Sequence, residues 1–182
     1  MTRNGTKFEG VRHEGVEILR VGVSMPDTAS LPKEVFDFYS LLSQRAKEWA
    51  LTTLADRVIK AFEEYNASYG GRAAFFRRLN YLFECSVTYN DENFVSIIAD
   101  VRVSRGGSEL FFVRNASIWD VRENTILSPR RCFKLFCDEN KRKEVFSRKF
   151  SHDGAFIRDG FCVFYKCGTS HGKYREFLCK IK

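Results

Sequence analysis

The chain has 182 residues, within the range of a single domain, and carries a net charge of +7. Hydrophobic residues make up 44% of it, 18 of them Phe, which excludes a disordered chain and suffices for a core without disulfides or metal. No run approaches the roughly 18–20 apolar residues of a membrane helix, and no apolar stretch follows the first residues as in a secretory signal. We expect one domain over residues 1–182, with 1–15 as a loosely ordered arm. Without a signal or anchor, a cytoplasmic location is expected, or an extracytoplasmic one if the chain is a trimmed ectodomain.

The first half of the chain is dominated by one predicted helix. Two short alternating stretches within residues 16–23 predict an entry strand or hairpin arm. From Lys33 to about Tyr65 there is no Gly or Pro, and apolar residues recur in steps of three and four. This stripe predicts a long amphipathic helix, weakened in its middle by Thr52–Thr53. Trp49 and Phe62 are expected to be buried on its inner side or flank.

The second half reads as short strands. An antiparallel meander is predicted from alternating or apolar runs separated by turn residues, over Leu82–Tyr89, Phe94–Val103, Leu110–Val121 and Thr125–Leu127. A helical segment then begins at Pro129, and three further strands are expected over Ala155–Ile157, Phe161–Tyr165 and Phe177–Ile181. The predicted fold class is α+β: a long N-terminal helix packed on an antiparallel meander, with a short second helix and C-terminal strands. We expect a monomer or weak dimer.

The cysteines are predicted to be reduced and buried. They lie among hydrophobic neighbours, at Cys85, Cys132, Cys137, Cys162, Cys167 and Cys179. Cys132 and Cys137 are five residues apart, and so are Cys162 and Cys167. This spacing places the two thiols of a pair on opposite faces of a strand or well apart on a helix. No zinc site is predicted from such spacings.

No catalytic or cofactor-binding constellation stands out. The only histidines are His13, His152 and His171, and none has a partner at a recognised metal spacing. The carboxylates that could serve acid–base work include Asp91 and Asp120, which fall at turns where structural roles are commoner. We therefore expect no enzymatic activity and no cofactor.

Several short motifs occur together in an order that resembles RsiV-like, DUF3298-type domains over roughly residues 30–182. They are the stretch 87–96, the pair Gly106-Gly107, Ser117–Asp120 and Asp159–Tyr165. The resemblance implies a helix leading into a meander, and a non-catalytic, sensor-like module that binds a protein or cell-wall-related ligand. Where the family often continues its double glycine with Ala-His, this chain has Ser108 and Glu109.

Loops would make the contacts in such a module. The candidate contact residues are Asn90, Asp91, Arg105, Ser108, Glu109 and His171.

A basic segment gives the alternative function. Residues 130–149 hold eight Lys/Arg against three Asp/Glu, namely Arg130, Arg131, Lys134, Lys141, Arg142, Lys143, Arg148 and Lys149. Phe133, Phe136, Phe146 and Phe150 are interleaved with them, so cations could hold phosphates while an aromatic ring stacks on a base. The same spacing also fits a solvated helix face above core phenylalanines. The alternative is thus an anion- or nucleic-acid-binding module.

Overall fold

A computed structural model describes residues 6–26, 31–71, 75–140, 153–167 and 174–181 of the chain. These residues fall into two compact units. Unit 1 comprises residues 1–25, 37–84 and 100–112, and unit 2 comprises 26–36, 85–99 and 113–182. The prediction of a single domain stays a prediction.

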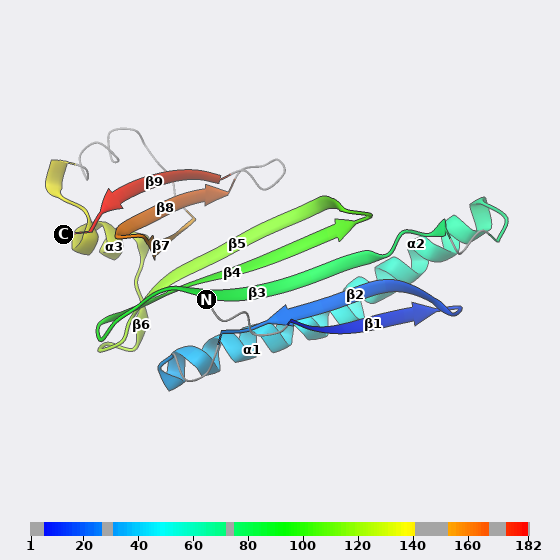
Figure 1. The fold of residues 1–182 in the computed structure, drawn as a ribbon, viewed down its shortest axis with the longest axis horizontal. Helices are drawn as coiled ribbons and strands as arrows, with labels where there is room; N and C mark the ends of the chain where they lie inside the picture. Colours follow the sequence, from blue (N-terminus) through cyan, green and yellow to red (C-terminus); the bar gives the residue numbers. More distant parts are fainter. Residues whose placement is uncertain (1–5, 27–30, 72–74, 141–152, 168–173, 182) are drawn as a thin grey trace. The chain divides into compact units, whose positions relative to one another are not determined.

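The structure contains one large sheet, one long helix and one small sheet (Figure 1). The large sheet has the order β1-β2-β3-β4-β5-β6, formed by β1 (Lys7–His13), β2 (Val16–Ser24), β3 (Leu79–Asn90), β4 (Phe94–Arg105), β5 (Ser108–Asp120) and β6 (Thr125–Ile126). The small sheet has the order β7-β8-β9, formed by β7 (Gly154–Arg158), β8 (Phe161–Cys167) and β9 (Tyr174–Lys180). The predicted α+β class, the meander and the three C-terminal strands are confirmed.

The start of the chain differs from its prediction as a loose arm. Residues Lys7–His13 form β1, which pairs antiparallel with β2. β2 in turn pairs in parallel with β3, so the long helix serves as the crossover between two parallel neighbours. Sequence patterns show where strands lie but not their direction, so this parallel pair was not predicted.

The long helix runs as α1 (Lys33–Trp49), a π-helical turn η2 (Ala50–Leu54) and α2 (Ala55–Ser68). The π turn falls on the Thr52–Thr53 pair, where the Thr52 hydroxyl donates a hydrogen bond to the carbonyl oxygen of Glu48 at 2.8 Å. Such a hydroxyl competes with the helical backbone bonds and explains why the helix departs from α geometry here.

The helix packs on the strands of unit 1. Lys47 forms an ion pair of 2.7 Å with Glu9 of β1, and α2 lies against β2. Phe62 is fully buried, as predicted. Trp49 is 44% exposed, although its ring lies 6.0 Å from that of Tyr81, so its predicted burial is wrong.

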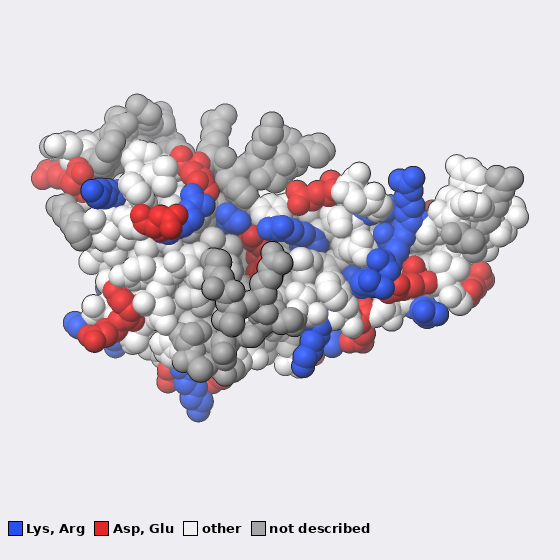
Figure 2. Space-filling view, in the orientation of Figure 1, with Lys and Arg blue, Asp and Glu red and all other residues white. Residues whose placement is uncertain are grey.

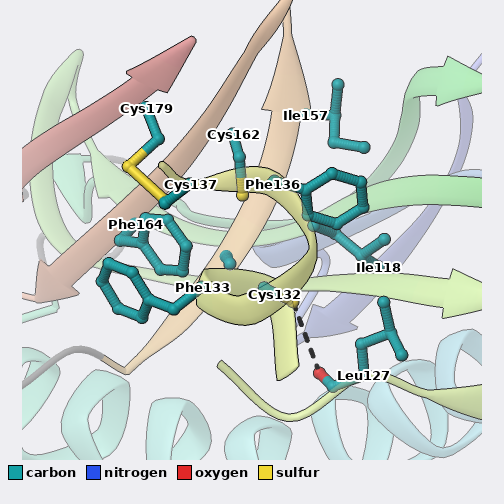
Figure 3. Packing of buried hydrophobic residues seen from close by; sticks show 11 residues of the cluster. Ile118, Leu127, Cys132, Phe133, Phe136, Cys137, Ile157, Cys162, Phe164 and Cys179 are labelled. Carbon is teal, nitrogen blue, oxygen red and sulfur yellow. Dashed lines mark hydrogen bonds between the residues drawn. A yellow bond between two sulfur atoms is a disulfide. The ribbon is translucent and has the colours of Figure 1, made fainter. Parts of the chain in front are cut away.

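Unit 2 has its own apolar core, centred on α3 (Pro129–Phe136) and the small sheet (Figure 3). The Ser128 side chain caps the helix by accepting a hydrogen bond from the Arg131 amide at 3.3 Å. Pro129 occupies the first turn of the helix, where its lack of an N–H group costs no helical hydrogen bond. The buried face of α3 stacks Phe133 on Phe164, with ring centroids 3.7 Å apart.

A disulfide in this core corrects the prediction of six reduced thiols. Cys137, directly after α3, is bonded to Cys179 of β9, with Cα atoms 5.5 Å apart (Figure 3). The two residues are 42 positions apart in sequence, so spacing between near neighbours could not reveal the pair. The thiols of Cys85, Cys132 and Cys162 are reduced and buried, as predicted. Burial raises the pKa of the Cys132 thiol to about 12.

Candidate functional site

One face of the sheet in unit 1 carries side chains that the helix does not cover. Leu79, Tyr81 and Phe83 of β3 are buried, and the residues between them are only partly buried. Because side chains alternate along a strand, Asn80 and Leu82 lie on the opposite face. We call this second face the open face.

The cross-strand register brings three strands together there. Phe8 of β1 is the Cα partner of Gly22 of β2, and Gly22 is the partner of Leu82 of β3. A Cβ atom on Gly22 would lie 2.6 Å from the Phe8 ring and 3.1 Å from a methyl carbon of Leu82. The absence of a side chain at Gly22 therefore leaves room over β2 for the Phe8 ring and the Leu82 side chain.

A groove of about 420 Å³ crosses this face. Its apolar part includes Phe8 and Leu82, and Phe8 is 59% exposed. Its polar part is contributed by β2, β3, β4 and the start of β5, with the side chains of Arg20, Asn80, Arg102, Ser104 and Glu109. The volume is within the usual range of ligand sites, about 300–1,000 Å³.

The carboxylate of Glu17 fixes the polar end of the groove at β2. Arg20 donates two hydrogen bonds of 3.0 Å to its two oxygens, and Arg78 donates a third at 2.6 Å. Arg78 also donates to the Asn80 side-chain oxygen at 3.2 Å. The hydrogen bonds from Arg20 and Arg78 hold the pKa of Glu17 below its usual value. This network orients Arg20 and Asn80 before any ligand arrives.

The polar groups on β4 are held less tightly. A guanidinium nitrogen of Arg102 lies 3.6 Å from a carboxylate oxygen of Asp100, and its charged carbon lies 5.2 Å from the Phe112 ring centroid. Asp100 itself is buried. Arg102 is thus aligned by a carboxylate on its own strand and an aromatic ring on β5, while about half of its side chain stays exposed.

The predicted loop contacts have structural roles where the structure describes them. One oxygen of Asp91 accepts hydrogen bonds from the amides of Asn93 and Phe94 at 2.8 and 2.6 Å, and the other accepts from the Tyr89 hydroxyl. Although burial opposes it, these bonds together lower the pKa of Asp91. Asn90 ends β3 immediately before this turn.

The remaining predicted contacts divide between the groove and other places. Glu109 reaches the groove, and Ser108 begins β5 beside it. Arg105 lies 5.5 Å from the ring centroid of Phe76, away from the groove lining. His171 lies outside the described residues. Sequence reasoning missed Phe8, Arg20, Asn80, Leu82, Arg102 and Ser104. The alternation of β3 could have suggested Asn80 and Leu82, but the convergence of four strands could not be read from it.

The basic segment is only partly described. Arg130, Arg131 and Lys134 are exposed on α3, and Arg131 pairs with Glu123 at 2.8 Å. Its aromatic neighbours Phe133 and Phe136 are buried and cannot stack on a base. Five of the predicted cations lie outside the described residues, namely Lys141, Arg142, Lys143, Arg148 and Lys149.

The charges on the visible face are mixed. Figure 2 shows Lys and Arg side chains interspersed with Asp and Glu, without an extended patch of one sign among the described residues. In the same part of the chain, no group of three or more His, Cys, Asp or Glu side chains is placed to hold a metal ion. Nor does any helix there have the length and apolarity needed to cross a membrane.

Comparisons with known proteins find similarity at the level of structure. No family model and no curated protein matches the sequence. A solved protein from Pseudomonas aeruginosa is 12% identical with a TM-score of 0.47, and the match covers 98% of this chain and 92% of that one. One from Bacteroides fragilis is 12% identical with a TM-score of 0.41, covering 99% of this chain and 92% of that one. Both are DUF3298 family proteins.

DUF3298 is also the family that the sequence motifs resemble. Neither structure bears out the finer RsiV-like assignment. Similarities of this size carry no conclusion about the function of this chain.

Proposed function

We propose that this chain is a non-catalytic binding module and that the groove on the open face of unit 1 contacts a partner protein. The observation that carries the proposal is the exposed Phe8 ring, which lies over Gly22 and beside Leu82. Exposed apolar surface that is rimmed by polar residues is typical of sites that contact a partner or ligand.

The residues around the ring have the character of a protein interface. Aromatic and arginine side chains dominate the binding energy of protein interfaces, at sites surrounded by polar groups. Here Arg20 and Arg102 flank the apolar part of the groove, and Asn80 and Ser104 add hydrogen-bonding groups. All lie on strands, and Arg20 is further fixed by Glu17, so the surface is arranged before binding.

The proposal of a non-catalytic role is supported by how the carboxylates are used. Asp91 and Asp120 each accept two backbone amide hydrogen bonds within turns. Asp100 pairs with Arg102 on the open face. These carboxylates stabilise turns or an arginine side chain. The pKa of the buried Cys132 thiol is raised, which disfavours the nucleophilic thiolate.

We also propose that the protein folds in an oxidising compartment. The Cys137–Cys179 disulfide supports this location, because such bonds persist outside the reducing cytosol. The proposal departs from the cytoplasmic location expected from the sequence.

The alternative, a nucleic-acid-binding module, is weakened by the burial of the phenylalanines on α3, although the cations on this helix are exposed. Arg130, Arg131 and Lys134 could contact phosphates, whereas Phe133 and Phe136 are core residues. Changing the three cations to Ser should therefore leave partner binding unchanged. Salt-steep binding of mixed-sequence DNA or RNA that disappears in this variant would favour the alternative.

Site-specific photo-cross-linking in the native cell tests the proposal. A photoreactive phenylalanine analogue is placed at Phe8 or Leu82, and at Arg57 on the exposed side of α2 as a matched control. We expect a discrete adduct with one protein from both groove positions and none from position 57. Equal adducts from all three positions, or none from the groove, would contradict the proposal.

A further inference from the structure

We propose that the groove receives the carboxyl end of a polypeptide whose last side chain is apolar. The inference rests on the proposed function and names the chemistry of the partner. It follows from three properties of the groove: its unused hydrogen-bond donors, its balanced charge and its open apolar floor.

The groove offers more donors than acceptors. Two nitrogens of Arg20 hold Glu17, which leaves its third nitrogen for a ligand. The oxygen of Asn80 is occupied by Arg78, which leaves its amide N–H groups as donors. The Arg102 guanidinium forms an ion pair with Asp100, with 3.6 Å between a nitrogen and a carboxylate oxygen, and it can still donate hydrogen bonds to a second carboxylate.

Among the side chains that line the groove, the acceptors are few. Glu109 contributes a carboxylate and Ser104 a hydroxyl, which can donate or accept. Tyr81 also borders the groove, but its buried side chain lies on the opposite face of β3. A ligand that satisfies Arg20, Asn80 and Arg102 must therefore bring acceptor oxygens. A carboxylate brings two, in the planar geometry that guanidinium groups match.

The charge balance favours one negative charge over several. Arg20 and Arg78 share the single negative charge of Glu17, and Arg102 is partly offset by Asp100. Glu109 adds a further negative charge at the β5 side. A multiply charged phosphate would be repelled by the carboxylates of Glu17, Asp100 and Glu109, and little positive charge is left to balance it. A ligand with a single carboxylate carries less charge and can bind the Arg102 guanidinium beside Asp100.

The shape of the site favours a chain end over a small free acid. Ligand sites for small molecules bury most of the ligand surface, typically 70–90%. This groove is open along the sheet and is floored by Phe8 and Leu82. An apolar last side chain can contact this floor while the preceding residues continue across the strands.

The test uses a fluorescein-labelled pentapeptide, Gly-Ser-Gly-Leu-Phe, as its free acid and as its C-terminal amide. Anisotropy titrations of the full chain should show roughly tenfold or greater preference for the acid, the size expected for a charge-assisted hydrogen bond. Arg102→Gln should abolish the preference, and Arg57→Gln, far along the helix, should retain it. Competition by N-acetylphenylalanine as strong as by the acid peptide would overturn the assignment to a chain end.

A second variant distinguishes charge from a change in folding. Glu109→Gln removes a like charge, so it should strengthen binding of the acid peptide and leave the amide unaffected. Equal affinity of the acid and amide for the unmodified chain would overturn this inference. Cross-links from Phe8 and Leu82 would still stand in that case, so the two proposals fail separately.

Discussion

The hydroxyl group of Tyr165 lies 2.9 Å from the amide nitrogen of Ala116, whose hydrogen bond it accepts. The same hydroxyl donates to the carbonyl oxygen of Arg114 at 3.1 Å. A side chain of β8 thus satisfies two backbone groups of β5 that a neighbouring strand would otherwise pair. Within unit 2 this protects part of the β5 edge from pairing with another chain.

Removing this hydroxyl should destabilise the protein. Tyr165→Phe leaves the Ala116 amide and the Arg114 carbonyl without their partner, at a cost of about 1–3 kcal/mol in the free energy of unfolding. Urea denaturation measures the change. Tyr69→Phe, on a residue that is mostly exposed, is the control and should change stability little. An unchanged midpoint for Tyr165→Phe would show that water replaces the hydroxyl.

Replacing Gly154 should destabilise the protein about as much as removing the Tyr165 hydroxyl that it faces. It is the cross-strand partner of Tyr165, and a Cβ atom there would lie 2.6 Å from the Tyr165 oxygen and 2.9 Å from the Ala116 carbonyl oxygen. Gly154→Ala should cost about 1–3 kcal/mol, as overpacking does. In the double variant with Tyr165→Phe the cost should fall in part, because the 2.6 Å contact with the hydroxyl is gone while a ring carbon remains 2.8 Å away. Strict additivity of the two costs would contradict this explanation.

The disulfide should contribute to stability under oxidising conditions. Closing a loop between residues 42 apart stabilises the folded state by up to about 4 kcal/mol in the chain-entropy model. Adding reductant should lower the urea midpoint of the natural chain. The Cys137→Ser/Cys179→Ser variant should be less stable and insensitive to reductant. A denatured, unreduced sample should titrate two fewer thiols than a reduced one, and equal titres would contradict the bond.

Glu17 should give stability a dependence on pH. Its pKa is lowered in the folded state, so its contribution is fully present above the unfolded pKa and is lost as pH falls through the folded value. Glu17→Gln should cost about 1 kcal/mol at neutral pH, since the network is partly exposed. The difference between the two proteins should shrink towards acid pH; a constant difference would assign the effect to packing.

Phe62 and Trp49 lie on the same long helix but should respond differently to truncation. Phe62 is fully buried, so Phe62→Ala should cost about 3–5 kcal/mol. Trp49 is 44% exposed, so Trp49→Ala should cost clearly less despite the larger side chain. Chemical denaturation of both variants decides the matter, and equal losses would mean that Trp49 is better packed than its exposure indicates.

The sequence alone determined the class of fold and most of the helices and strands, although not the strand Lys7–His13. The apolar period of Lys33–Tyr65 fixed the long helix, because only a helix brings residues three and four apart to one face. The alternation of apolar and polar residues, together with turn residues between the runs, marked the strands of the meander, which span Leu79–Asp120. The Thr52–Thr53 pair located the irregular turn, because a hydroxyl acts on the backbone of its own helix.

Only the tertiary structure decided pairing and the candidate site. Cys137 and Cys179 meet because α3 and β9 pack in one core, and the parallel β2–β3 pair depends on the helix crossing between them. Phe8, Gly22 and Leu82 belong to three strands whose register is set by hydrogen bonds between distant segments. A periodic sequence pattern indicates on which face of its own helix or strand a residue lies. A groove is formed by strands that meet only after folding, so no such pattern predicts it.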